Sequence, residues 1–325
     1  MHYLKYLLLV AVFAGRMAVA EDDILVPTPP VPRAAKKAAP VVPRFANLKY
    51  GDATNDANLL DIYLPEKVDP PVPVVVWIHG GGWANGDKSP SKQFLQLLPR
   101  GLAVASINYR LSGQAPFPAQ IYDCKGAIRY LRAHAKEYQI DPNRIGVWGV
   151  SAGGHLAALL GTSGDVKEIE GNVGGNREVS SRVQAVSEYA GPTDLGQVFA
   201  QGANEPAFMN NVVLRGYYEN LLGGGPVVTH PDLIRIANPI TYISADNPPF
   251  QIFHGDKDVM VPIGQGQLLA EALKAKGVPC DYTRLAGMGH GFGQGQYLAT
   301  AAFFEKHLKS AVVATPVVPT VKTGQ

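Results

Sequence analysis

The feature that most constrains the fold is an uninterrupted apolar run, VPVVVWIH, at residues 72–79. A strand with one face in water alternates apolar and polar residues, whereas this run has no polar face. Such a segment is typical of a strand that is buried on both faces of a mostly parallel sheet, with helices on each side. The run therefore predicts an α/β fold built around a central strand.

Strand-like and helix-like segments alternate along the rest of the chain. The predicted strands are residues 103–109, 144–148, 183–189, 250–254 and 280–285, and the predicted helices are residues 117–138, 153–161, 264–276 and 300–310. Residues 47–50 and 58–64 precede them and predict an antiparallel edge pair. This alternation indicates a doubly wound, mostly parallel sheet with helices on both faces.

One long segment, residues 195–247, does not follow the alternation. It is rich in glycine around residues 223–225 and carries Phe199, Phe208, Met209, Tyr217 and Tyr218. Two interpretations stay open at this point. The segment is either an insertion over the mouth of an active site or an ordinary surface insertion.

The two ends of the chain differ from the middle in composition. Residues 1–20 predict a signal peptide, because Lys5 and an apolar run lead to Ala18-Val19-Ala20, just before Glu21. The alternative is an uncleaved anchor. Cleavage would give a secreted or periplasmic protein with no membrane segment. Proline density predicts a linker over residues 21–44 and a flexible tail over residues 314–325, so we expect one domain over residues 45–313.

The charge of the chain bears on which partners it can bind. Without Lys5 and Arg16, the 29 Lys and Arg residues fall to 27 and equal the 27 Asp and Glu residues. A neutral mature protein gives no electrostatic reason to expect nucleic acid or an anionic membrane as partner.

The chain has two cysteines. Cys124 lies on the apolar stripe of a predicted helix and Cys280 begins a predicted strand. We favour two separate core cysteines over a disulfide, although export would permit one.

The pentapeptide Gly149-Val150-Ser151-Ala152-Gly153 joins the strand that ends at Trp148 to a helix of small residues. A G-x-S-x-G sequence in that position predicts a nucleophile elbow, a strained turn that presents the serine hydroxyl. Side chains at the two glycine positions would collide. The alternative is a tight turn with a capping serine.

A serine nucleophile needs a base, and the base needs a carboxylate that fixes its tautomer. His290 lies in the loop after the last predicted strand and is the predicted base, whereas we expect His155 and His254 only to pack. The loop after residue 254 contains two aspartates. We predict that Asp258 orients the histidine and that Asp256 braces the loop.

The glycine run His79-Gly80-Gly81-Gly82-Trp83 follows the central strand. Backbone N–H groups without a neighbouring Cβ are suited to hold a developing oxyanion, together with the N–H of Ala152. The order serine, aspartate, histidine along the chain is that of α/β-hydrolases.

Together these motifs resemble the hormone-sensitive-lipase-like esterases, and most closely the bacterial feruloyl-esterase-like (BD-FAE-like) group. The segments that carry the resemblance are Asn85-Gly86-Asp87-Lys88, Asn108-Tyr109-Arg110-Leu111, Asp141-Pro142-Asn143-Arg144-Ile145, GVSAGGH at 149–155, Pro248-Pro249-Phe250 and HGDKD at 254–258. The resemblance covers about residues 47–308. It implies the α/β-hydrolase fold and Gly81, Gly82 and Ala152 as oxyanion donors. The two proline-rich ends and the long segment after Asp194 depart from the group.

The sequence predicts a secreted serine carboxylesterase that forms an acyl-enzyme and uses neither a metal nor an organic cofactor. Its expected substrates are short-chain or carbohydrate-linked esters of the acetyl or feruloyl type, on small molecules or polysaccharides. One alternative is a serine peptidase of the prolyl-oligopeptidase kind, which normally carries a large extra domain. The other is a non-catalytic binding protein on the same fold, although all three triad residues are present.

Overall fold

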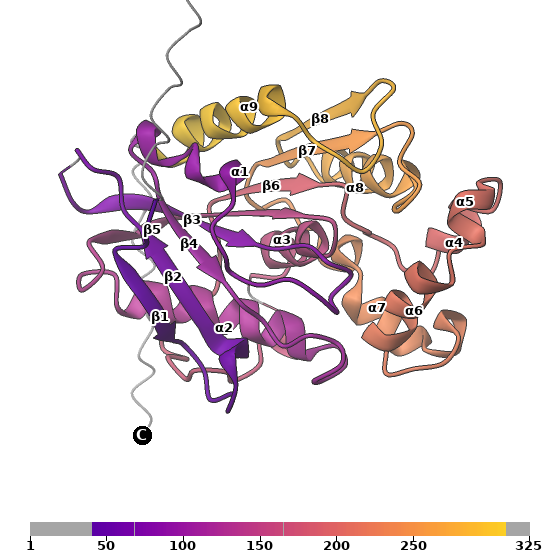
Figure 1. Cartoon of the computed structure of the whole chain (residues 1–325), viewed down its shortest axis with the longest axis horizontal. Coiled ribbons are helices and arrows are strands. Elements are labelled where there is room, and N and C mark those ends of the chain that lie inside the picture. Colours follow the sequence, from indigo (N-terminus) through magenta and orange to yellow (C-terminus); the bar gives the residue numbers. More distant parts are fainter. Residues whose placement is uncertain (1–40, 68, 165, 310–325) are drawn as a thin grey trace, which may run out of the picture. The chain divides into compact units, whose positions relative to one another are not determined.

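The computed structural model of the chain describes residues 41–67, 69–164 and 166–309 (Figure 1). The predicted signal peptide (1–20), the linker up to residue 40 and the predicted tail (314–325) lie outside these ranges. The described part contains a sheet of eight strands in the order β1-β2-β4-β3-β5-β6-β7-β8. The strands are β1 (Phe45–Lys49), β2 (Leu59–Tyr63), β3 (Val72–Ile78), β4 (Ala103–Ile107), β5 (Ile140–Val150), β6 (Ala185–Tyr189), β7 (Phe250–Gly255) and β8 (Cys280–Leu285).

The direction of the strands follows the prediction. β3 to β8 are parallel to one another, whereas β1 pairs antiparallel with β2 and β2 pairs antiparallel with β4. The fold is therefore a mostly parallel sheet with an antiparallel edge pair, and both expectations are confirmed.

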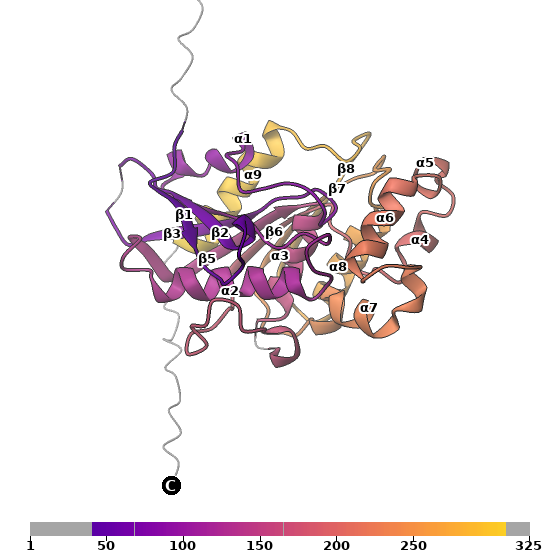
Figure 2. The ribbon, with the colours of Figure 1, turned by 60° about the horizontal axis from the view of Figure 1, so that its bottom comes forward.

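The apolar run of β3 has no polar face because helices cover both sides of it. Val74, Val76 and Ile78 belong to one cluster of buried side chains, together with residues of α2 (Ala119–Ala133), α3 (Ala152–Thr162) and α8 (Gly264–Ala275). Val75 and Trp77 belong to a second cluster, with residues of α1 (Lys92–Leu95) and α9 (Gln294–Phe304). Figure 2 shows these two groups of helices on opposite faces of the sheet.

Two predicted helices have different bounds in the structure. The helix predicted at 117–138 is α2, which begins after Pro118 and ends at Ala133, where His134 leaves the helical conformation. The residue before a proline is disfavoured in the helical conformation, which keeps Phe117 outside the helix and accounts for the later start. The helix predicted at 300–310 begins earlier, at Gln294, because the Gln296 side chain accepts a hydrogen bond from the Gly293 N–H and caps it. It continues as a π-helical turn over Glu305–Lys309.

The two cysteines are free thiols. Cys124 is buried on α2, as predicted, whereas Cys280 at the start of β8 is only half-buried. The disulfide alternative is therefore wrong.

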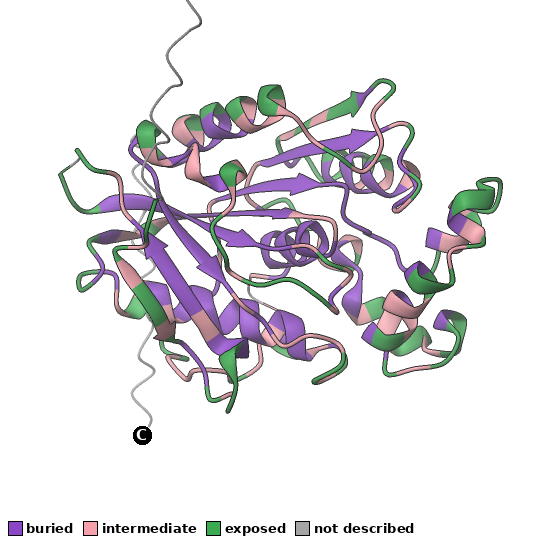
Figure 3. Cartoon of the chain, in the orientation of Figure 1, coloured by how far each residue is buried: buried purple, intermediate pink, exposed green. Residues whose placement is uncertain are grey.

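The segment after β6 folds into short helices. They are α4 (Val198–Gln201), α5 (Pro206–Met209), α6 (Val212–Leu221) and α7 (Pro231–Ala237), with 3₁₀ turns at Val227–Thr229 and Pro239–Tyr242. Figure 1 shows them beyond the carboxyl ends of the central strands, and Figure 3 shows more exposed residues on them than on the sheet. None of the helices that the structure describes is long and apolar enough to cross a bilayer.

Candidate active site

The turn between β5 and α3 holds Ser151 in a conformation that few residues adopt, with φ of 58° and ψ of −123°. A Cβ on Gly149 would lie 2.0 Å from the carbonyl oxygen of Gly153, and a Cβ on Gly153 would lie 2.1 Å from that of Ile78. Only glycine fits at either position. The Ser151 N–H donates to the Tyr189 carbonyl at 2.7 Å, which fixes the turn against β6. The pentapeptide thus forms the strained elbow that its sequence predicts.

The loops after β7 and β8 bring Asp258 to His290. The Nδ1 of His290 lies 2.7 Å from Asp258 Oδ2. The other carboxylate oxygen, Oδ1, accepts hydrogen bonds from the backbone N–H groups of Met260 (2.8 Å) and Val261 (2.9 Å). The Asp258 side chain is fully buried. Its position is therefore fixed by backbone donors on one oxygen and by the imidazole on the other.

Asp256 has a different environment. It pairs with Arg284 Nη2 at 3.0 Å and accepts the Gly287 N–H at 2.7 Å. These contacts tie the loop after β7 to the end of β8 and to the loop that follows it. The structure places Asp258, and not Asp256, against the histidine.

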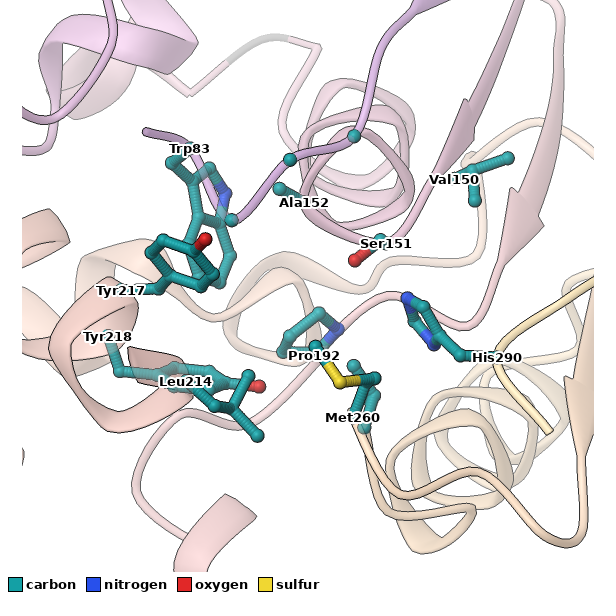
Figure 4. Close-up of a pocket in the computed structure, with 14 residues that line it drawn as sticks. Trp83, Val150, Ser151, Ala152, Pro192, Leu214, Tyr217, Tyr218, Met260 and His290 are labelled. Carbon is teal, nitrogen blue, oxygen red and sulfur yellow. The ribbon is translucent and has the colours of Figure 1, made fainter. Parts of the chain in front are cut away.

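Ser151 and His290 line one cavity of about 340 Å³. Figure 4 shows the serine hydroxyl and the imidazole ring directed into the same space. Gly81, Gly82 and Ala152, the predicted oxyanion donors, line the cavity beside them. The structure thus brings five of the six predicted site residues, all except Asp258, to the lining of one cavity.

The glycine loop after β3 is held in a turn that requires glycine. Gly81 has φ of 105° and Gly82 has φ of 61°. A Cβ on Gly81 would lie 2.3 Å from the Asn85 carbonyl oxygen, and one on Gly82 would lie 2.4 Å from the Tyr217 ring. The backbone of this loop therefore approaches its neighbours more closely than any other residue type allows.

The wall opposite the elbow comes from the long segment after β6. Leu214, Tyr217 and Tyr218 of α6 line the cavity. Of the two interpretations of this segment, the structure favours the insertion over the site. The sequence gives its aromatic content but does not indicate which of its residues reach the cavity.

His155 is buried behind the site, as expected. Its Nδ1 accepts a hydrogen bond from Trp83 Nε1 at 3.2 Å, and its Nε2–H donates to the Ala237 carbonyl at 2.7 Å. Burial lowers the pKa of His155 to about 4. A neutral imidazole therefore joins the glycine loop, α3 and the end of α7.

His254 is buried, as expected, but it also lies against Asp258, a contact that the sequence analysis did not predict. It is fully buried, and its Nε2–H donates to the Val261 carbonyl at 2.9 Å and lies 3.5 Å from Asp258 Oδ2. Burial lowers the pKa of His254, so the ring stays neutral. Two imidazoles thus flank one carboxylate. The four-residue spacing from His254 to Asp258 is the signal that could have indicated this contact.

Glu188 is a second group that the sequence analysis missed. It lies near the end of β6, fully buried, and accepts a hydrogen bond from the Gly191 N–H. Burial, with a smaller contribution from the charge of Asp258, raises the pKa of Glu188 to about 8. An acidic residue near the end of an apolar strand is the signal that could have found it.

No cluster of His, Cys, Asp and Glu suited to a metal ion occurs in residues 41–67, 69–164 and 166–309.

Comparison with known proteins identifies relatives of the chain. A family model described as BD-FAE matches residues 60–273, more than half of the chain, a range that includes Ser151 and Asp258 and ends before His290. The esterase LipQ of Mycobacterium tuberculosis is 32% identical over 252 residues, which are 76% of this chain and 57% of LipQ. The chain thus spans little more than half the length of that curated relative.

Two solved structures extend the comparison. A truncated carbohydrate esterase from gut microbiota is 32% identical with a TM-score of 0.74, over 82% of this chain and 96% of that chain. Propionate-bound esterase Est2 of Thermogutta terrifontis is 28% identical with a TM-score of 0.60, over 80% of this chain and 90% of that chain. On these matches and on its sheet topology, the chain belongs to the BD-FAE family of esterases with the α/β-hydrolase fold.

Proposed function

We propose that the chain is a serine carboxylesterase that acts through an acyl-enzyme. Ser151 Oγ attacks the ester carbonyl carbon while His290 Nε2 removes its proton, and the same imidazole then protonates the departing alcohol. Asp258 holds Nδ1–H and stabilises the imidazolium. Water, activated by His290, releases the acid. The 2.7 Å contact between His290 and Asp258, at one edge of the cavity that Ser151 also lines, is the observation that carries this proposal.

In this proposal the oxyanion is held by the N–H groups of Gly81, Gly82 and Ala152. All three residues line the cavity next to Ser151. Such donors act because they are oriented before the charge develops, and the loss of one typically costs about 3–4 kcal/mol of transition-state stabilisation.

The proposed substrates are neutral esters with a short acyl group, or acetyl- and feruloyl-type esters on carbohydrates. Apart from His290, the side chains that line the cavity carry no ionisable charge at neutral pH. The names of the carbohydrate esterase and of propionate-bound Est2 point to the same range of acyl groups. We expect the highest kcat/KM on acetyl to butyryl esters and no activation at an oil–water interface.

We also propose export, because residues 1–20 have the pattern of a signal peptide. Mass spectrometry of protein recovered outside the cytoplasm should give a chain that begins at Glu21. An intact Met1 on membrane-bound protein would support the anchor instead.

The reaction is tested with Ser151→Ala, His290→Ala and the double variant on 4-nitrophenyl acetate. Each should lower kcat by about 10³-fold or more, and the double variant should be little worse than either single one, because the residues act as a unit. A fluorophosphonate should label the wild type at Ser151 and leave Ser151→Ala unlabelled. A Ser151→Ala variant with a tenth of wild-type turnover would overturn the assignment.

A further inference from the structure

Tyr218 is a buried tyrosine whose hydroxyl is directed into the cavity. It lies on α6 and is 1% exposed. Figure 4 shows its hydroxyl pointing into the cavity on the side of Met260. No residue that the structure describes forms a hydrogen bond with this hydroxyl. Buried tyrosine hydroxyls usually have a partner. The partner must therefore come from whatever occupies the cavity.

The position of this hydroxyl is set by packing of its ring. The Tyr218 ring meets Trp83 edge-on at 5.4 Å between centroids, and Phe199 at 5.4 Å from another side. Trp83 is itself held by its hydrogen bond to His155. Because the ring is fixed on two sides, the hydroxyl keeps one direction whether or not it is hydrogen-bonded.

Tyr217, the neighbouring residue, differs in both respects. Its hydroxyl accepts a hydrogen bond from Asn85 Nδ2 at 3.4 Å, and its ring lies against Gly82. It is half-buried, so water reaches it as well. Of these two tyrosines, only Tyr218 presents to the cavity a hydroxyl that has no protein partner, on a side chain that is otherwise buried.

The chemistry of the missing partner follows from the surroundings of Tyr218. Burial, and then the charge of Asp258, raise the pKa of Tyr218, so the hydroxyl keeps its proton. A neutral hydroxyl in an apolar wall of Leu214, Trp83 and Met260 can donate to an uncharged oxygen. Ether, hydroxyl and carbonyl oxygens of a substrate are of this kind.

We propose that Tyr218 Oη donates a hydrogen bond to an oxygen of the substrate outside the reacting ester group. The site would then favour alkoxy- or hydroxy-bearing esters, of which sugar esters are one class, over hydrocarbon esters of the same shape. A bound hydrocarbon would cover the hydroxyl and shield it from water without forming a hydrogen bond to it, and this penalty is the basis of the selectivity. The inference rests on the proposed esterase function, since it requires an ester in this cavity.

The test uses substrate pairs in which one CH₂ is replaced by oxygen. For the acyl side the pair is 4-nitrophenyl methoxyacetate and 4-nitrophenyl butyrate, and for the alcohol side it is 2-methoxyethyl acetate and butyl acetate. The preference for the oxygen-bearing member, as a ratio of kcat/KM values, is compared between the wild type and Tyr218→Phe. This comparison cancels differences in intrinsic reactivity within a pair.

In at least one pair, Tyr218→Phe should lower kcat/KM for the oxygen-bearing member about tenfold and change the hydrocarbon member less than about twofold. The affected pair identifies the side of the ester that Tyr218 contacts. Tyr63→Phe is the matched control, because Tyr63 Oη likewise has no hydrogen-bond partner but lies on β2, and Tyr63 does not line the cavity. It should leave both ratios unchanged.

The inference would be overturned if Tyr218→Phe left all kcat/KM values as in the wild type, or if it lowered both members of each pair by the same factor. The second result would indicate a structural or oxyanion-binding role. Both outcomes are independent of the test with Ser151→Ala. If Ser151→Ala is inactive and the ratios do not change, only the inference on Tyr218 fails.

Discussion

The two walls of the cavity are built in different ways. On the side of the sheet, the elbow, the glycine loop and the loops after β7 and β8 fix their residues through the backbone, as in the positive φ of Ser151 and the two N–H donors on Asp258. On the opposite side, α6 contributes Leu214 and Tyr218 through the packing of side chains. Few substitutions fit the backbone conformation of the first wall, whereas side chains of the second wall can be replaced by others of similar shape.

This difference leads us to expect that one wall carries the reaction chemistry and the other selects the substrate. Groups that transfer protons or hold developing charge need positions accurate to a fraction of an ångström, and backbone hydrogen bonds supply that accuracy. Groups that select a substrate need shape and one or two polar contacts. Changes in the first wall should therefore act on kcat, and changes in the second on the choice of substrate.

The largest effect is expected at Asp258. Asp258→Asn should lower kcat by about 10²–10⁴-fold, because an amide no longer holds the productive tautomer of His290. Asp256→Asn is the matched control in the same loop, and it should keep kcat within about threefold, since Asp256 contacts Arg284 and Gly287 and not the imidazole. Steady-state kinetics on 4-nitrophenyl acetate would check both. The reverse ranking would place the acid at Asp256.

The second prediction concerns the protonation state of Glu188, which is buried near the end of β6, behind the wall on the sheet side. With a pKa of about 8 in the folded protein and an ordinary value near 4.5 when unfolded, Glu188 binds its proton more tightly in the folded state. The unfolding free energy should therefore fall as pH rises from about 5 to 8. The contribution of this one group over that range is on the order of 3 kcal/mol.

Glu188→Gln keeps the shape and the acceptor for the Gly191 N–H but cannot ionise. Its unfolding free energy should depend less on pH over this range, as measured by urea denaturation at pH 5, 6, 7 and 8. Parallel pH profiles for the wild type and the variant would show that Glu188 is ionised in the folded state.

The smallest effect is expected on the opposite wall. Leu214→Ala opens space in the cavity, so the acyl chain length with the highest kcat/KM should increase by about one or two carbons, since each buried CH₂ contributes about 0.8 kcal/mol. The rate on acetyl esters should change little. Val213→Ala is the matched control, because Val213 is the preceding residue on α6 and is 61% exposed. An unchanged optimum in Leu214→Ala would show that α6 does not limit acyl length.

More of the wall that is fixed by its backbone could be predicted from the sequence than of the wall formed by α6. The strands and the elbow depend on local patterns, namely apolar runs and two glycines around Ser151, and these patterns can be recognised in the sequence. Leu214 and Tyr218 lie on a helix of ten residues inside a segment without regular alternation. Helices this short are positioned by the surfaces they pack on, so their inward residues were not predictable.

The contacts of His254 and Glu188 were missed for a related reason. Each lies in a predicted strand, where an apolar environment is the default expectation. Their contacts with Val261 and Gly191 depend on how the loop after each strand folds back onto that strand. No local sequence pattern predicts the path of these loops.

The hydrogen bond from His155 to Ala237 has a consequence for how such a site can diversify. The acceptor is a main-chain carbonyl, an atom that every residue type supplies. Side chains throughout the segment after β6 can therefore be exchanged without loss of this link, as long as the backbone returns to the same point. A segment transplanted from a relative would bring new selectivity and still be anchored to the glycine loop through Trp83. Deletion of the segment, in contrast, would leave the imidazole N–H without its acceptor and would weaken the hold on the loop proposed to bind the oxyanion.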